Sequence, residues 1–319
     1  MDSMLALHGL IFMGGLGGLW YGGDLTVYYA RRLAQRFAIS TLVLGLVILA
    51  LTADIPELAV TIYAALAGVC EVGVGDIIGG CFCDVAMVVG ITLLAAGRRV
   101  HVSAADGKRL AMLLLFAAAV MLGLLCLGSI GFYTGLALIA LYGCAIFYFC
   151  QQPALQEEVS VLPAIPVSDG EALWLLCLKC LGALAVIMLA SHATVYGLLQ
   201  FAVSSGIAVQ SLSTTLLCIG TTLPELAVCL GAIRQGDFGL AIGPALGTIL
   251  DKMTLLLGLL ATLAGKPVSL QGVWWPCIFM VLACGILAVR LLNPRPMGNR
   301  TGVLLLSLFI AYLACHVVL

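Results

Sequence analysis

Long runs of apolar residues, separated by short polar connections, make up most of this sequence. A transmembrane helix needs ~20 mostly apolar residues, and ten runs of suitable length can be marked. They lie at approximately 5–30, 38–64, 74–97, 108–127, 130–150, 172–203, 208–232, 239–264, 271–292 and 301–318. The pattern predicts an all-α, polytopic membrane protein with ten transmembrane helices.

The longest polar connection, at about 155–171, is rich in acidic residues and prolines. It separates five spans from five spans. We therefore expect a first five-helix repeat at 1–152, a cytoplasmic connecting loop at 153–171 and a second five-helix repeat at 172–319. An odd number of spans in each half would place the second half upside down relative to the first.

A repeated pentapeptide supports this division. Pro-Glu-Leu-Ala-Val at 56–60 recurs at 224–228, an offset of 168 residues because 224 − 56 = 168. The same offset relates pairs of glycines, which are Gly68 and Gly236, Gly75 and Gly243, Gly79 and Gly247, and Gly90 and Gly258. In transporters built from inverted repeats, the binding site lies near the bilayer midplane at the repeat interface. The paired Pro-Glu stretches predict such a site.

Composition and charge remove several classes of function. Of the 319 residues, 63% are hydrophobic and 9% are charged, whereas a soluble domain carries about 25% charged residues. The formal net charge of −1 argues against a nucleic-acid partner, which needs a basic surface. The cysteines lack zinc-finger spacing and no nucleophile–base constellation is evident, so we expect neither an enzyme nor a cofactor. The lipid bilayer is an expected partner, and no obligatory protein partner is indicated.

The basic residues predict the orientation in the membrane. Of the 14 Lys and Arg residues, 11 follow spans one, three, seven and nine, which places them on one side if the spans alternate. Lys266 falls on the other side, and Lys179 and Lys252 lie within spans. Because Lys and Arg are enriched in cytoplasmic loops, we expect both termini outside, in a bacterial or archaeal type of cytoplasmic membrane.

Carboxylates inside the apolar runs are the candidate binding residues. Glu57 and Glu225 lie in spans two and seven, and a charged residue inside a span usually faces a cavity and marks a functional site. The proline before each glutamate frees the backbone carbonyl four residues earlier. Asp54 precedes Glu57 by about one turn, as Thr221 and Thr222 precede Glu225. Such oxygens are ligands for hard cations like Na⁺ or Ca²⁺. The alternative to a cation site is that the two helices are merely kinked and that neighbouring groups cap the glutamates.

Spans three and eight supply the facing wall of the candidate site. Asp76 and Asp84 lie on one helix face, because their spacing is a multiple of four residues. The corresponding stretch of the second half contains Thr248, Asp251 and Lys252. The glycines nearby would also be explained by close helix packing. The charges are not explained by packing, and they favour a polar cavity.

Lys252 is the unusual member of this group. An ammonium inside the membrane must pair, reach an interface or lose its proton. We expect it to pair with Glu57, Asp84 or Glu225. It would then stand in for a bound monovalent cation, or act as a proton-coupling group. In the alternative arrangement, Asp251 faces the cavity and the side chain of Lys252 reaches an interface of the membrane.

Other polar residues within the spans are candidates for an ion path. Asp24 and His192 lie in spans one and six at equivalent positions of the two halves. Either could line a path or be satisfied by a neighbouring helix. Asp76 and Asp251 are further candidates for the path.

The motifs resemble those of the cation/Ca²⁺ exchanger (CaCA) family, especially the prokaryotic Na⁺/Ca²⁺ exchangers. The alpha-repeats of that family read roughly Gly-Thr-Ser-x-Pro-Glu, then Gly-Asn-x-x-Gly-Ser-Asn-x-x-Asn or Asp, and 220–225 here reads Gly-Thr-Thr-Leu-Pro-Glu. The resemblance covers essentially the whole chain. It implies that Glu57 and Glu225 bind Ca²⁺. It also implies that the ligands for Na⁺ include Asp84, Thr221, Thr222 and Thr248. It also implies that spans one and six move past the other helices.

The departures from the family motif concern charge. Asp54 stands where the motif has a serine, and Lys252 stands at its final Asp or Asn position, opposite Asp84 in the first half. Counting Asp54, Glu57, Asp84 and Glu225 against Lys252 gives −4 + 1 = −3. The expected function is antiport of Ca²⁺ or another cation against Na⁺ or H⁺ by alternating access. The alternatives are a non-transporting member that acts as a cation sensor or membrane partner, and a transporter of a different divalent metal.

Overall fold

The computed structural model describes residues 2–36, 54–97, 104–150, 173–234, 238–293 and 297–318. Nearly all of these residues are helical, which confirms the all-α fold. Each of the ten predicted spans contains a helix or a run of consecutive helical segments. The expected connecting loop at 153–171 lies outside the described residues, so the boundaries of the two halves stay a prediction.

The helical elements follow the same order in the two halves. Those of the first half are α1 (Asp2–Arg36), α4 (Ile55–Leu66), α5 (Cys70–Cys83), the π-helical segment η2 (Asp84–Val88), α6 (Val89–Ala96), α7 (Ala104–Leu127) and α8 (Phe132–Cys150). Those of the second half are α10 (Leu173–Ser205), α11 (Val209–Leu212), η4 (Ser213–Leu217), α12 (Cys218–Arg234), α13 (Phe238–Asp251), η5 (Lys252–Leu256), α14 (Leu257–Leu263), α15 (Trp274–Leu291) and α16 (Asn299–Val318).

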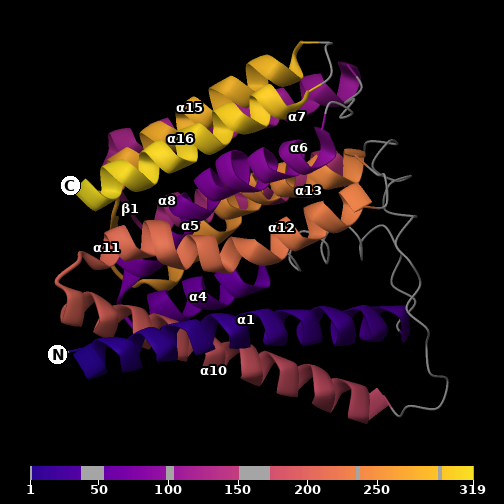
Figure 1. Ribbon diagram of the computed structural model, residues 1–319. Helices are drawn as coiled ribbons and strands as arrows, with labels where there is room; N and C mark the ends of the chain where they lie inside the picture. The colour runs from indigo at the N-terminus through magenta and orange to yellow at the C-terminus, as the bar shows by residue number, and fades with distance from the viewer. Residues whose placement is uncertain are drawn as a thin grey trace.

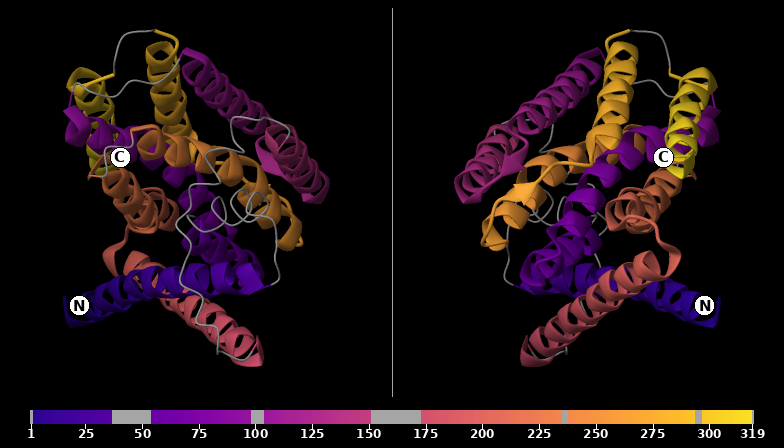
Figure 2. Two further views of the ribbon diagram at one scale, coloured as in Figure 1. Left: turned by 90° about the vertical axis from the view of Figure 1, so that its right-hand side faces the viewer. Right: turned by 90° about the vertical axis from the view of Figure 1, so that its left-hand side faces the viewer.

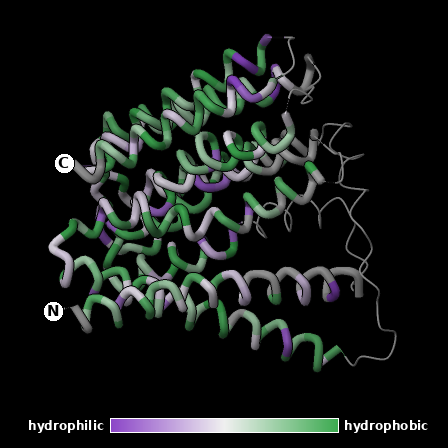
Figure 3. Tube along the Cα trace, viewed as in Figure 1, coloured by the Kyte–Doolittle hydropathy of each residue, from purple (hydrophilic) through white to green (hydrophobic). Residues whose placement is uncertain are grey.

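The membrane-spanning character of these helices is evident in length and hydropathy. Six described helical stretches are long and apolar enough to cross a bilayer, and four shorter apolar helices accompany them. The first part of span two, at 38–53, lies outside the described residues. Figure 3 shows that hydrophobic residues dominate along the helices, with hydrophilic positions between them in the central helices. The protein is therefore a multi-pass membrane protein.

The helices form a central group with a separate pair on one side. The pair is α1 and α10, which pack along each other and cross beneath the rest of the molecule (Figures 1 and 2). In the centre, α5 contacts α4, α12 and η4. On the far side, α7 packs on α15, and α16 packs on α6. The central group therefore holds both Pro-Glu helices, α4 and α12.

The internal repeat extends to the bounds of single elements. Helix α13 ends 168 residues after α5, because 251 − 83 = 168. Each is followed directly by a five-residue π-helical segment, η2 or η5. Strands β1 (Ser129–Ile130) and β2 (Val268–Ser269) join the two halves as an antiparallel pair. In Figure 1, α1 begins and α16 ends at the same end of the molecule, as an even number of spans requires.

Two glycine crossings are equivalent in the two halves. Gly258 of α14 meets Gly135 of α8 so closely that a Cβ on Gly258 would lie 2.8 Å from the Gly135 carbonyl oxygen. Gly90 of α6 meets Gly302 of α16, where a Cβ on Gly302 would lie 2.8 Å from the Gly90 carbonyl oxygen. Small residues that let backbones approach are the common device for helix packing in membranes.

Substitution of Gly258 by valine is expected to destabilise the protein by roughly 1–3 kcal/mol, the cost of overpacking a close contact. The obstructing atom belongs to the backbone of α8, which cannot turn away as a side chain can. Thermal unfolding of the purified protein in detergent measures the effect. Gly123→Val is the matched control, because a Cβ on Gly123 meets nothing within 4 Å. Equal unfolding temperatures for the two variants would contradict the prediction.

Candidate cation-binding site

Four buried charged side chains from both halves meet in the centre of the molecule. Glu57 lies in the first turn of α4, and Glu225 lies in α12. Asp84 is the first residue of η2, and Lys252 is the first residue of η5. All are at most 4% exposed. The two π-helical segments thus place equivalent residues of the halves, one negative and one positive, in the same site; π-helical turns are frequent at functional sites.

The ammonium of Lys252 lies between three carboxylates. Its Nζ is 2.8 Å from Asp84 Oδ2, 2.8 Å from Glu57 Oε1 and 3.0 Å from Glu225 Oε1. Lys252 is 0% exposed, so the alternative that took this side chain to an interface is wrong. The expected pairing is confirmed with each of the three predicted partners. A buried ammonium needs such partners, because an uncompensated charge in a low-dielectric interior is very costly.

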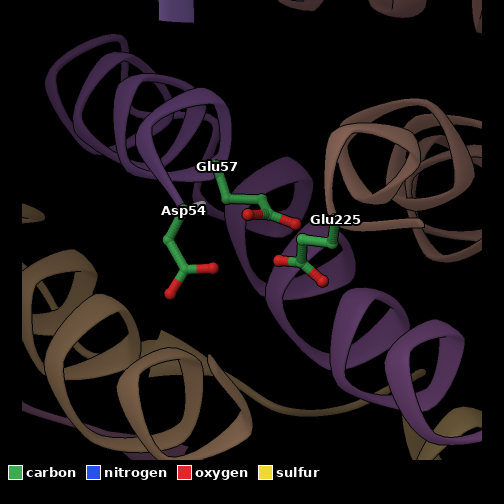
Figure 4. A group of neighbouring side chains, drawn as sticks. All are labelled: Asp54, Glu57 and Glu225. Atoms are coloured by element: carbon green, nitrogen blue, oxygen red, sulfur yellow. The ribbon is translucent and has the colours of Figure 1, made fainter. Parts of the chain in front are cut away.

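Asp54 adds a fourth carboxylate on one side of this group. Its Oδ1 is 3.9 Å from Lys252 Nζ, and the residue is 1% exposed. One oxygen each of Asp54, Glu57 and Glu225 lie within 4.8 Å of one another, which is close enough to share a metal ion. Figure 4 shows the side chains of Glu57 and Glu225 reaching toward each other, with Asp54 beside them.

The predicted threonine ligands are engaged in hydrogen bonds. Thr248 Oγ1 donates to Asp84 Oδ2 at 3.4 Å. Thr221 Oγ1 donates to Asp76 Oδ1 at 2.9 Å. These contacts fix the carboxylates of α5 and η2 against the second half. Asp76, predicted for the ion path, thus lies buried beside the site as the partner of Thr221.

The Pro-Glu stretches behave differently in the two halves. Helix α4 begins at Ile55, directly before its proline, whereas α12 continues through Pro224. The carbonyl freed by Pro224 is that of Gly220, because 224 − 4 = 220. It accepts a hydrogen bond from the indole Nε1 of Trp20 in α1, at 3.2 Å. That oxygen is therefore already partnered, which differs from the expectation that it would be left for a cation.

Two other predicted path residues, His192 and Asp251, form hydrogen bonds outside the central group. His192 is exposed, and its Nδ1 shares a hydrogen bond with the Tyr63 hydroxyl of α4. Asp251 is buried beside Lys252 and forms a side-chain hydrogen bond with Tyr142 of α8. Asp24 lies within α1, but its side chain is outside the described part of the structure. Their part in an ion path stays a prediction.

Two features of the site have little signal in the sequence. Gly80 leaves room at the centre, since a Cβ there would lie 3.4 Å from Lys252 Nζ and 3.5 Å from Glu57 Oε1. Cys83 and Cys218, from α5 and α12, bring their sulfur atoms to 3.4 Å next to the site. The positions of the glycines and cysteines in the sequence could suggest that helices pack closely. They could not show which atoms these residues contact.

Comparison with known proteins places the chain in a family. The sequence matches the family described as sodium/calcium exchanger protein over residues 7–151 and 175–318, which is most of its length. The chain belongs to this family. The matched residues include the Pro-Glu stretches of both α4 and α12, so the resemblance found in the motifs is confirmed.

The relatives found by sequence cover most of the chain. The sodium/calcium exchanger MaX1 of Methanosarcina acetivorans is 23% identical, with 97% of this chain and 98% of that protein covered. The inner membrane protein YrbG of Escherichia coli (strain K12) is 26% identical, with 92% of each covered. Among solved structures, an H⁺/Ca²⁺ exchanger, CAX, superposes with a TM-score of 0.74 at 18% identity, covering 96% of this chain and 82% of that one. This likeness shows that the chain and CAX share the same helical membrane fold.

Proposed function

We propose that this protein is a secondary active antiporter that exchanges Ca²⁺, or another divalent cation, for Na⁺ or H⁺ across a membrane. The observation that carries the proposal is the meeting of Glu57 and Glu225, one from each half, in a buried site within a chain of the exchanger family. Exchange of ions by alternating access makes no covalent bond, so the proposal requires neither enzyme chemistry nor a cofactor. Inorganic cations are the cargo.

The site has the chemistry that a hard cation needs. Carboxylate oxygens are preferred ligands for Ca²⁺, and those of Asp54, Glu57 and Glu225 converge from α4 and α12. The helices on either side also suit alternating access. The α1–α10 pair contacts both Pro-Glu helices, so a movement of the pair would open the site from one side and then from the other. Such rocking or gating around a fixed site is the usual scheme for inverted repeats.

The orientation and membrane belong to the same proposal. We place both termini outside a bacterial or archaeal type of cytoplasmic membrane, with the basic loops in the cytoplasm. The start of α1 and the end of α16 lie at the same end of the molecule, which supports placing both termini on one side of the membrane. No obligatory protein partner is required, because the cation site is built within a single chain.

One observation favours a second candidate function. The ammonium of Lys252 contacts three of the carboxylates, so it could compensate part of their negative charge without a transported ion. A member of this kind would sense cations or act through a membrane partner and would carry no flux. The two candidates differ in one measurable quantity, which is the flux of a divalent cation driven by an ion gradient.

Purified protein in liposomes is expected to take up radiolabelled Ca²⁺ when a Na⁺ gradient or a pH gradient is imposed. The gradient that drives uptake identifies the coupling ion, because an antiporter moves the second ion in the opposite direction. Liposomes without protein give the background. If neither gradient drives flux of Ca²⁺, nor of other divalent cations tried in its place, the antiporter is refuted and the sensor is favoured.

A further inference from the structure

The two helices of the α1–α10 pair interlock through glycines. A Cβ on Gly15 would lie 2.6 Å from the backbone nitrogen of Thr194, and a Cβ on Gly197 would lie 2.6 Å from that of Phe12. Small residues that let backbones approach this closely hold helices together in membranes. We therefore treat the pair as one body, whose position relative to the other helices is set by the contacts that it makes with them.

Trp20 joins α1 to α12 at the carbonyl that Pro224 frees. The indole Nε1 donates to the Gly220 oxygen at 3.2 Å, and this oxygen has lost its helical donor because proline has no N–H. Leu16, one turn earlier in α1, covers the same place, since a Cβ on Gly220 would lie 2.6 Å from Leu16 Cδ1. Trp20 is nevertheless 41% exposed, so packing alone does not explain its position. The hydrogen bond is the specific feature of this contact.

Two adjacent residues join α10 to the other Pro-Glu helix, α4. The hydroxyl of Ser191 donates to the Ala59 carbonyl oxygen at 2.9 Å, and Ser191 is buried. His192 shares a hydrogen bond with the Tyr63 hydroxyl, and the two rings lie edge to face with centroids 5.1 Å apart. Ala59 follows Glu57 by two residues. The α1–α10 pair is thus held to both Pro-Glu helices, close to the cation site.

The internal repeat indicates what would replace these contacts in the opposite access state, in which the site opens to the other side. A two-fold axis in the membrane plane exchanges the two sides of the membrane. If the two halves exchange conformations, each contact is therefore replaced by the one between residues at the 168-residue offset. Trp20 and Gly220 are replaced by Met188 and Thr52, because 20 + 168 = 188 and 220 − 168 = 52. A methionine thioether has no hydrogen to donate.

The contacts between α10 and α4 also lack equivalents. Ser191 corresponds to Gly23, because 191 − 168 = 23, and a glycine has no hydroxyl. Tyr63 corresponds to Gly231, because 63 + 168 = 231, so the hydroxyl that contacts His192 has no counterpart either. The opposite access state would therefore lose all three of these side-chain hydrogen bonds without gaining their equivalents.

We infer that Trp20, Ser191 and the Tyr63–His192 contact hold the α1–α10 pair in the access state described here and make it the resting state of the protein. This inference rests on the proposed antiport function and adds the residues that set its conformational preference. They are positioning residues, because they act on the helices that carry Glu57 and Glu225 and not on the cation. The asymmetry of the two halves then becomes a bias between the two access states.

The distance between two spin labels, measured by double electron–electron resonance in detergent, tests the bias. Labelled non-natural amino acids are placed at the exposed positions of Met4 in α1 and Leu127 in α7, which spares the native cysteines. The unmodified protein should give one dominant distance. From the typical net contribution of one hydrogen bond, Trp20→Phe should raise the ratio of a second distance to the first about fivefold. Trp174→Phe is the matched control, because it removes an indole that is 68% exposed from the same pair.

An exchange of residues between the halves separates the hydrogen bond from general packing. Trp20→Met with Met188→Trp moves the donor from α1 to α10, so it should favour the second distance more than Trp20→Phe does. Tyr63→Phe, which removes one hydroxyl, should shift the ratio in the same direction, and thermal unfolding verifies that each variant is folded. An unchanged ratio in Trp20→Phe, or no further rise in the double variant, would overturn the inference. Shifted ratios without gradient-driven flux would overturn the antiporter and leave the role of these contacts standing.

Discussion

Gradient-driven cation flux is expected to fall by at least about 100-fold in Glu57→Gln and in Glu225→Gln. Each substitution keeps the shape of the side chain and removes one negative charge from a fully buried group. Mutation of residues that only support the ligands of a metal site typically costs about 10–100-fold in affinity or activity, so the loss of a direct carboxylate ligand is expected to cost at least as much. The measurement is the initial rate of uptake of radiolabelled Ca²⁺ into liposomes under the gradient that drives the unmodified protein.

The equivalence of the two halves sharpens this expectation. Glu57 and Glu225 are related by the offset of 168 residues and contact the same ammonium. Both variants should therefore lose flux, whereas the exposed Glu71→Gln should transport at the normal rate. A variant at either glutamate that transports normally would show that the cation passes elsewhere, even if the other variant were inactive.

The meeting of Glu57 and Glu225 could be predicted from the sequence because both belong to the internal repeat. Long apolar runs predict helices, and Glu57 and Glu225 recur at the same point of both halves. The pairing of Lys252 was predictable for a related reason: a buried ammonium has few alternatives to carboxylate partners. These conclusions depend on the cost of charge in an apolar interior and not on the detailed packing of the helices.

The local partners in the site could not be predicted, because they depend on how separate helices pack. Trp20 donates a hydrogen bond to the Gly220 carbonyl oxygen only because α1 lies against α12. Thr221 donates to Asp76 only because α12 faces α5 at that level. The π-helical turns that begin at Asp84 and Lys252 have no clear signal in residue type. Contacts of this kind come from tertiary structure, on which local patterns give little information.

Taken together, the contacts distinguish the roles of the two halves. The first half contributes Asp54, Glu57 and Asp84, and the second contributes Glu225 and Lys252. The attraction between an acidic half and the ammonium of the other half crosses the repeat interface. Lys252 is therefore expected to stabilise the fold as well as to set the charge of the cation site.

Replacement of Lys252 by methionine is expected to destabilise the protein by about 3–5 kcal/mol, the usual cost of removing one partner of a buried charge pair. Methionine fills a similar volume, so the loss reports on charge more than on packing. Three carboxylates that contact the ammonium would be left without their positive partner. Equilibrium unfolding in mixed detergent micelles, at low concentrations of Na⁺ and Ca²⁺, measures the change.

Two further measurements separate loss of charge compensation from general damage to the core. Added Ca²⁺ should stabilise Lys252→Met more than the unmodified protein. Without the ammonium, the carboxylates should bind Ca²⁺ more tightly, and a ligand that binds the folded state more tightly stabilises it more. The double variant Asp84→Asn with Lys252→Met should lose less free energy of unfolding than the two single variants lose together. Asp84 Oδ2 lies 2.8 Å from the ammonium, and residues in contact couple in a double-mutant cycle. Additive losses together with no response to Ca²⁺ would mean that Lys252 does not compensate these carboxylates, and that the cation site is organised by something other than its ammonium.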